Sequence, residues 1–113
     1  MAVEWDPREA EFQTQFEALR RHFMQELPDR RAALVSAWND CADGGDEAPW
    51  LRLRDVAHKL SGSATNYGLD VVGDVARGLD RLLSGRTPCR ARDTAEGRVA
   101  DLTAALDEAI AAT

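Results

Sequence analysis

Residues 50–68, WLRLRDVAHKLSGSATNYG, decide the fold of this 113-residue chain. Apolar residues recur in this stretch at alternating steps of three and four: Trp50, Leu53, Ala57, Leu60, Ala64 and Tyr67. This spacing is typical of the buried stripe of an amphipathic helix, and a glycine at the end is typical of a C-cap. The stretch therefore predicts a helix that begins near Asp46, tolerates Pro49 in its first turn and ends at Gly68.

The same rhythm continues towards the C-terminus. The next helix is expected to carry Leu69, Val72, Ala76, Leu79 and Leu83, and to end at Ser84-Gly85. After a break at residues 86–88, the pair Asp93 and Glu96 resembles a capping pair. The last helix then offers Val99, Leu102, Leu106 and Ile110 as its apolar stripe.

Two further helices are expected towards the N-terminus. Asp6 and Pro7 are typical of an N-cap and a first helical position. The stripe that follows consists of Phe12, Phe16, Leu19, Phe23 and Leu27. Because Pro28 disfavours helical geometry at the residue before it, we expect a break there. The second helix then spans about residues 29–42, with Leu34, Trp38 and Cys41 on one side, and residues 43–49 form a loop.

Five helices with short connections and no strand pattern predict an all-α fold. We expect an antiparallel four-helix bundle with an additional N-terminal helix, which packs alongside the other four or caps them. The length fits one core, and no repeat or interdomain linker interrupts the chain, so residues 1–113 are expected to form a single helical bundle domain.

Composition excludes several classes of protein. The net charge of -6 and the pI near 4.8 argue against binding to nucleic acid, which needs a basic stripe. No apolar run approaches the roughly 20 residues that cross a membrane. Cys41 and Cys89 lack metal-ligand spacing and are too few for a disulfide framework, so a cytoplasmic location is expected. The apolar stripes are used up within one chain, which favours a monomer.

His58 lies on the flank of the helix predicted for residues 50–68. At 3.6 residues per turn it stands about 125° from the centre of the apolar stripe, so its imidazole should be exposed. The same strip carries Leu51, Arg54, Ser61, Gly62 and Thr65. A glycine inside a helix costs roughly 1 kcal/mol relative to alanine. Gly62, one turn after His58, removes bulk beside the ring and would let a large partner approach.

Three kinds of chemistry could use an exposed imidazole. Asp55 and His58 stand three residues apart, as in half of a carboxylate-bundle metal site, but the second acid–histidine pair is missing, so no metal site is expected. Hydrolysis needs a cleft and an orienting third group, and neither a Ser/Cys–His pairing nor a Gly-rich phosphate loop is present, which argues against an ordinary enzyme. The third possibility is that the imidazole itself accepts a group, since neutral imidazole is a good nucleophile near pH 7.

The segment H-K-L-S-G-S-A-T-N-Y-G, residues 58–68, resembles the motif of histidine-containing phosphotransfer (HPt) domains. That motif is usually written H-x-L-K-G-x-A, with a glycine ten residues past the histidine. Five residues fall on its positions: His58, Leu60, Gly62, Ala64 and Gly68. The resemblance implies a four-helix bundle that carries phosphate between receiver domains in multistep phosphorelays.

In this family the histidine Nε2 attacks the phospho-aspartate of one receiver and then gives the phosphoryl group to the aspartate of another. The resemblance implies response-regulator receiver domains and a hybrid histidine kinase as partners. Magnesium and most catalytic groups belong to the receiver, so an HPt protein is not an enzyme in the ordinary sense and needs no cofactor of its own.

One position departs from the family pattern. Many members have a lysine three residues after the histidine, where this chain has Ser61. We expect Arg54, one turn before His58, to neutralise phosphoryl charge instead, whereas Lys59 could reach the ring only by bending its stem. Pairing of the helices on either side of Gly68 should bring Asp80 level with His58. There it could orient the imidazole or accept its Nδ1–H, or else pair with a neighbouring arginine, Arg77 or Arg81.

A receiver is expected to dock over the strip of Gly62 and Thr65, with Leu51 in apolar contact. The rival hypothesis is an HPt-like module that docks a receiver or a kinase and regulates it without carrying phosphate. Ser61 keeps that rival open, and acid-labile phosphate on His58 would separate the two hypotheses.

Overall fold

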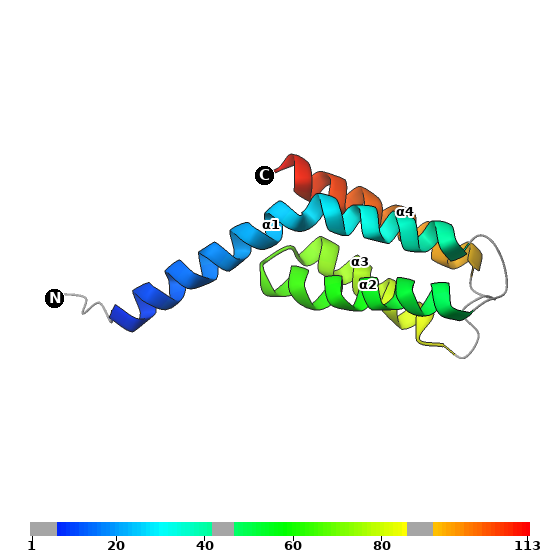
Figure 1. The fold of residues 1–113 in the computed structure, drawn as a ribbon, viewed down its shortest axis with the longest axis horizontal. Helices are drawn as coiled ribbons and strands as arrows, with labels where there is room; N and C mark the ends of the chain where they lie inside the picture. The colour runs from blue at the N-terminus through cyan, green and yellow to red at the C-terminus, as the bar shows by residue number, and fades with distance from the viewer. Residues whose placement is uncertain (1–6, 42–46, 86–91) are drawn as a thin grey trace.

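The computed structural model describes residues 7–41, 47–85 and 92–113, which form helices and short turns and contain no strand. The helices are α1 (Pro7–Cys41), α2 (Glu47–Asn66), α3 (Asp70–Leu83) and α4 (Arg92–Ala111). They run alternately in opposite directions (Figure 1), with α2 packed on α1 and α3, and α4 packed on α3 and α1. The prediction of an all-α, antiparallel four-helix bundle is confirmed.

The prediction of an additional N-terminal helix is wrong. α1 continues through Pro28 as one helix of 35 residues, and its second half is itself a member of the bundle. Pro28 is exposed, while Leu27 and Leu34 on either side of it have no exposed surface. Proline removes one helical hydrogen bond and favours a kink. Packing of both leucines against the bundle holds the helix together across that defect.

The first part of α1 projects beyond the bundle instead of packing alongside or capping it. Figure 1 shows α1 changing direction part-way along its length, which a proline inside the helix explains. We call residues 7–22, which precede the first buried residue of α1, the α1 arm. Phe12 and Leu19 on this arm are 67% and 57% exposed, so these two residues of the predicted apolar stripe are not buried in the bundle.

The remaining stripes form one core. Its largest fully buried side chains are Leu27, Leu34, Cys41, Leu53, Leu60, Leu79, Leu102 and Leu106. Burial raises the pKa of the Cys41 thiol, as expected for a sulfur that packs as an apolar group. At one end of the core, Trp50 meets Trp38 edge-on with ring centroids 6.0 Å apart. At the other end, Tyr67 packs between the rings of Phe16 and Phe23.

The turn between α2 and α3 sets the register of the site. Gly68 has a φ of +83°, which favours glycine. The backbone N–H of Leu69 donates to the Ala64 carbonyl at 2.8 Å, and that of Gly68 donates to the Thr65 carbonyl at 3.2 Å. This pair of hydrogen bonds is the Schellman motif, and it confirms the predicted C-cap. It folds α3 back along α2, so residues roughly equidistant from Gly68 lie side by side.

Helix ends differ from the predictions in two places. Asp93 lies inside the first turn of α4 and not before the helix. In the first turn its negative charge interacts favourably with the positive end of the helix dipole. α2 begins at Glu47 and includes Pro49 in its first turn, which confirms the predicted helix start near Asp46, so the loop predicted for residues 43–49 extends too far at its C-terminal end. The predicted N-cap Asp6 and most of the predicted loop lie outside the described residues. Within those residues, no helix is long and apolar enough to cross a membrane.

Candidate functional site

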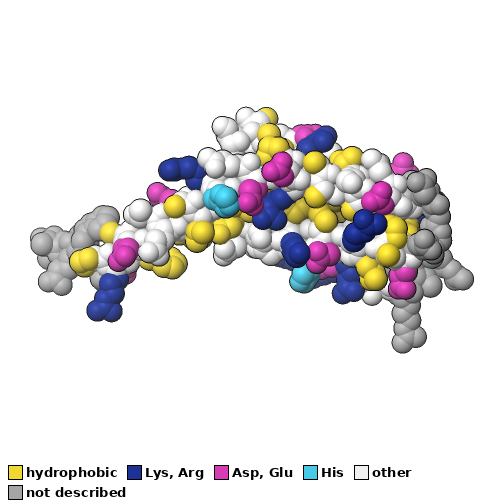
Figure 2. Space-filling view, viewed as in Figure 1, with side chains coloured by type: hydrophobic (Ala, Val, Ile, Leu, Met, Phe, Trp, Pro, Cys, Tyr) yellow, Lys and Arg dark blue, Asp and Glu magenta, His cyan; other side chains and the backbone are white. Residues whose placement is uncertain are grey.

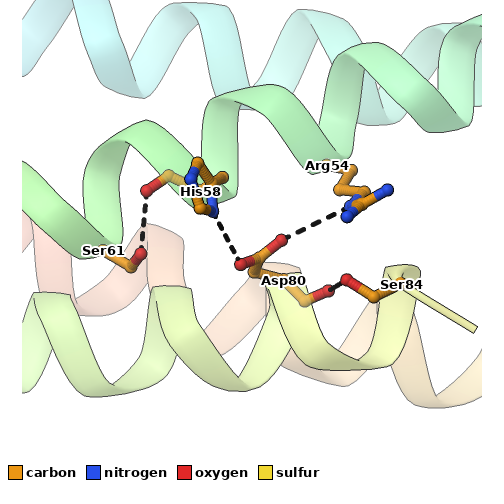
Figure 3. A network of polar contacts seen from close by, with 5 residues as sticks. All are labelled: Arg54, His58, Ser61, Asp80 and Ser84. Carbon is orange, nitrogen blue, oxygen red and sulfur yellow. Dashed lines mark hydrogen bonds and ion pairs between the residues drawn. The ribbon is translucent and has the colours of Figure 1, made fainter.

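His58 stands on the outer side of α2, and its side chain is 73% exposed. Its Nδ1 lies 3.0 Å from Oδ2 of Asp80, which reaches across from α3 (Figure 3). The Asp80 side chain is only 17% exposed and lies between the imidazole and the bundle. The tight α2–α3 turn produces this contact, because Asp80 follows Gly68 by about as many residues as His58 precedes it.

The contact determines which nitrogen of the imidazole is available. An ionised carboxylate can only accept hydrogen bonds, so we infer that Nδ1 carries the proton and donates to Asp80. In the neutral ring the lone pair then belongs to Nε2, on the far side of the ring from Asp80. His58 therefore presents a nucleophilic nitrogen outwards while its other nitrogen is held in place.

Arg54 approaches the same carboxylate from the other side. Its Nε lies 3.6 Å from Oδ1 of Asp80, an ion pair that is longer than a hydrogen bond. Oδ1 is buried and has no hydrogen-bond partner among the described residues. The Arg54 side chain is about half exposed and only loosely held. It lies one helical turn before His58 and can move towards an anionic group on Nε2 without breaking a tight contact.

Ser61 and Lys59 are engaged elsewhere. The Ser61 hydroxyl donates to the backbone carbonyl of His58 at 2.8 Å and not to the ring. Lys59 Nζ lies 3.0 Å from Asp55 Oδ2, one turn back on the exposed side of α2. Of the cationic side chains predicted for the site, the structure brings only Arg54 to the carboxylate that holds His58.

Gly62 has no internal reason to be glycine. A Cβ built at this position meets no atom within 4 Å, and its backbone is ordinary helix. At Gly73, by contrast, a Cβ would collide with the hydroxyl of Thr65 and lie 3.2 Å from its backbone nitrogen. Gly73 therefore serves close packing of α2 and α3, and Thr65, although exposed, turns its hydroxyl towards α3. Gly62 leaves open space beside His58.

Two shallow hollows border His58. Leu51, Arg54 and Asp55 line the first together with the imidazole, and Leu51 is 52% exposed. The second runs towards the end of α2 and is lined by His58, Lys59, Gly62, Ser63, Asn66 and Tyr67. The sequence identified His58, Lys59 and Gly62 in the second hollow. Sequence reasoning missed Ser63, Asn66 and Tyr67, the last because Tyr67 was assigned to the core alone. Its position at the end of the stripe was the available signal.

Among the described residues, no group of three or more His, Cys, Asp or Glu side chains could hold a metal ion. Asp55, the acid that precedes His58 by three residues, pairs with Lys59. The chemistry available at the site is that of one exposed imidazole, one carboxylate and one guanidinium.

The fold and the site define an all-helical domain that presents one exposed histidine beside an acidic side chain. A family model described as the Hpt domain matches residues 18–112, which is most of the chain. The chain belongs to the Hpt domain family, whose members carry out histidine phosphotransfer in phosphorelays. Searches of curated proteins and of solved structures gave no match.

Proposed function

We propose that this protein relays a phosphoryl group between the aspartates of receiver domains, with His58 as the phosphorylated residue. One observation carries the proposal above all. His58 Nδ1 is held 3.0 Å from Asp80 Oδ2, while the side chain remains 73% exposed. The carboxylate that holds the ring comes from the neighbouring helix α3 and is itself only 17% exposed, so the imidazole is fixed against the bundle while its second nitrogen faces outwards.

The transfer step requires no proton to leave the site. The Nε2 lone pair of His58 attacks the phosphorus of the receiver's aspartyl phosphate, and an N–P bond forms. The P–O bond to the aspartate breaks, and its electron pair leaves with the aspartate carboxylate. The ring keeps its proton on Nδ1 and becomes a cation that faces the Asp80 carboxylate. The reverse sequence delivers the phosphoryl group to a second receiver.

The surrounding residues have separate roles in this proposal. Asp80 positions the ring and stabilises its positive charge, because its carboxylate is only 17% exposed and is therefore screened less than one in open water. Arg54 neutralises phosphoryl oxygens in place of the lysine that many family members carry. Leu51 and Gly62 offer an apolar contact and space for the receiver, which supplies the magnesium. Docking is brief, as a shuttle must release each partner.

Ser61 keeps a second candidate function open. Its hydroxyl bonds to the helix backbone, so this position gives a phosphoryl group on His58 no positive charge, unlike the lysine of many family members. In this candidate, the protein docks a receiver or a hybrid histidine kinase and regulates it without carrying phosphate.

The test is transfer from receiver domains charged with acetyl phosphate and Mg²⁺. The wild type, His58→Gln and His22→Gln are compared. His22 is a matched control because it is also exposed and also lies beside a carboxylate, Glu26, at 2.9 Å. Acid-labile, base-stable phosphate on the wild type and on His22→Gln, but not on His58→Gln, supports the relay. Binding without any label, across several receivers, supports the docking module.

A further inference from the structure

We propose that the α1 arm and Tyr67 extend the surface on which the receiver docks, and that the arm selects among receivers. This inference rests on the proposed function, since it assumes that a receiver meets His58. It adds an apolar contact region, with Phe12, Phe16 and Leu19, on a part of the chain far from the histidine in sequence.

The surface beside His58 leads directly to the arm. The hollow lined by His58, Gly62 and Asn66 ends at Tyr67. The Tyr67 ring lies 5.4 Å, centroid to centroid, from that of Phe16, where the arm leaves the bundle. Arg20 of the arm donates from Nε to the Tyr67 carbonyl at 3.0 Å, which ties the arm to the end of α2. A partner that fills this hollow therefore meets the arm.

The arm has an uncovered apolar face. Phe12, Phe16 and Leu19 follow one another by four and three residues, so they share one side of the helix. Phe12 and Leu19 are exposed there, while Phe16 between them is half-buried against Tyr67. Figure 2 shows hydrophobic side chains exposed along this projecting part of α1. Most of the stability of a helix in a protein comes from packing of its apolar face. Exposed apolar patches of this kind mark sites of interaction.

The dimensions fit one globular partner centred on His58. Along α2, Leu51 lies about 10 Å before His58 and Tyr67 about 14 Å after it, at 1.5 Å per residue. An ordinary protein interface covers about 800 Å² on each partner and involves about 20–30 residues. Such a footprint places Leu51 at one edge and Tyr67 with the arm at the other. The reacting nitrogen then lies between two apolar contacts.

The receiver is the occupant to which this geometry points, because the arm is continuous with the atom that a receiver must touch. A second copy of the chain would have no need of that continuity. The family match begins at residue 18, so Phe12 and Phe16 lie outside the part that the family model describes. Residues beyond the shared chemistry are the ones expected to discriminate among partners.

The experiment compares the wild type with Phe12→Ser/Leu19→Ser and with Val71→Ser. Val71 is a matched control: it is 64% exposed, and it lies nine residues before Asp80, about half a turn away on the opposite side of α3. The rate of transfer is measured against the concentration of a receiver charged with acetyl phosphate. We expect kcat/KM to fall about tenfold for the arm variant, about 1.4 kcal/mol, with kcat within about twofold. Val71→Ser should match the wild type.

Direct phosphorylation of His58 by phosphoramidate is measured in the same proteins, and we expect it to be unchanged by all three substitutions. Unchanged transfer in the arm variant, for every receiver that phosphorylates the wild type, overturns the role of the arm and leaves the relay intact. Absence of transfer to the wild type from any receiver overturns the relay and the arm together. Sedimentation velocity identifies the remaining outcome: loss of a dimer in the arm variant with unchanged transfer assigns the arm to a second copy.

Discussion

Asp80 touches two side chains of α2, His58 through Oδ2 at 3.0 Å and Arg54 through Oδ1 at 3.6 Å. This division lets one carboxylate hold the ring while a cation stays near the place where phosphoryl charge would accumulate. Neither partner needs to move for Nε2 to react. His58, Asp80 and Arg54 therefore form one polar group on the α2–α3 pair.

Asp80→Asn tests the charge within that group. The asparagine oxygen can still accept from Nδ1–H, so the ring stays oriented, but the imidazolium formed during transfer loses its counter-charge. We expect transfer from a receiver and phosphorylation by phosphoramidate both to slow about tenfold, about 1.4 kcal/mol, measured as initial rates, since a charge-assisted hydrogen bond is roughly twice as strong as the neutral one that replaces it. Asp74→Asn is the control, because Asp74 is an exposed residue of α3 that pairs with Arg77. Equal rates for Asp80→Asn and the wild type would remove Asp80 from the mechanism.

Arg54→Ala tests the nearby cation. A phosphoryl group on His58 would lose a neighbouring guanidinium, so we expect the half-life of the phosphohistidine to shorten and transfer to slow by about three- to tenfold. Arg52→Ala is the matched control: Arg52 is also an exposed arginine of α2, but it pairs with Asp40 on α1 at 3.5 Å. Decay of the label is followed at neutral pH. Identical decay in the two variants would contradict the role given to Arg54.

At this scale, the sequence alone revealed the identities of the residues but not their side-chain pairing. The motif identifies His58 and Gly62, and counting residues on either side of Gly68 predicts that Asp80 lies level with His58. That Arg54 shares the carboxylate depends on how the side chains cross between α2 and α3, which spacing does not determine. The pairing of Lys59 with Asp55 was foreseeable, because the two residues are four apart on one helix.

On the scale of α2, Gly62 weakens a helix that its neighbours stabilise. A side chain there meets no atom of the protein, so Gly62→Leu should raise the free energy of unfolding by up to about 1 kcal/mol. It should also lower transfer from a receiver more than tenfold, because the leucine occupies the space beside the imidazole. Gly97→Leu is the control on α4, where a Cβ also meets nothing within 4 Å. Urea denaturation and transfer rates are measured for both.

The two glycines separate access from stability. We expect Gly97→Leu to gain stability without losing transfer, and Gly62→Leu to retain phosphorylation by the small donor phosphoramidate. Full transfer from receivers in Gly62→Leu would show that the partner does not approach this part of α2.

On the scale of α1, Pro28 bends a helix that packing holds together. Its nitrogen has no hydrogen to donate, and proline costs about 3 kcal/mol inside a helix relative to alanine. Pro28 is exposed, so Pro28→Ala removes no buried contact, and we expect the free energy of unfolding to rise by about 1–3 kcal/mol in urea denaturation. Lower stability would show that the bend itself is needed for the packing of Leu27 and Leu34.

Some features of the helices could be predicted from the sequence, and the continuity of α1 could not. The stripes of α2, α3 and α4 and the cap at Gly68 were predictable, since each depends on neighbours within a few residues. The continuity of α1 was not, because the local preference at Leu27 favours a break. Burial of Leu27 and Leu34 against other helices outweighs that preference. Tertiary packing contributes more free energy than the local preference of one residue.

The whole molecule divides into a bundle that holds the site and an arm that contributes little to the core. The first buried residue of α1 is Phe23, and the family match begins at residue 18. Of the arm, Phe16 alone makes a ring contact with the bundle, at Tyr67. Stability and the chemistry of His58 should therefore depend on the bundle, and recognition of the receiver on the arm.

Deletion of residues 1–14 tests this division. The shortened chain keeps Phe16 and Arg20, and thus the contacts of the arm with Tyr67, but lacks the exposed Phe12. Because none of the removed residues that the structure describes, 7–14, is buried, we expect the free energy of unfolding to change by less than about 1 kcal/mol, and phosphorylation of His58 by phosphoramidate to remain as in the full chain. Transfer from a receiver should require a higher receiver concentration to reach the same rate. A large loss of stability would show that the arm is part of the folding unit, so that the bundle and the arm could not be treated as separate in function.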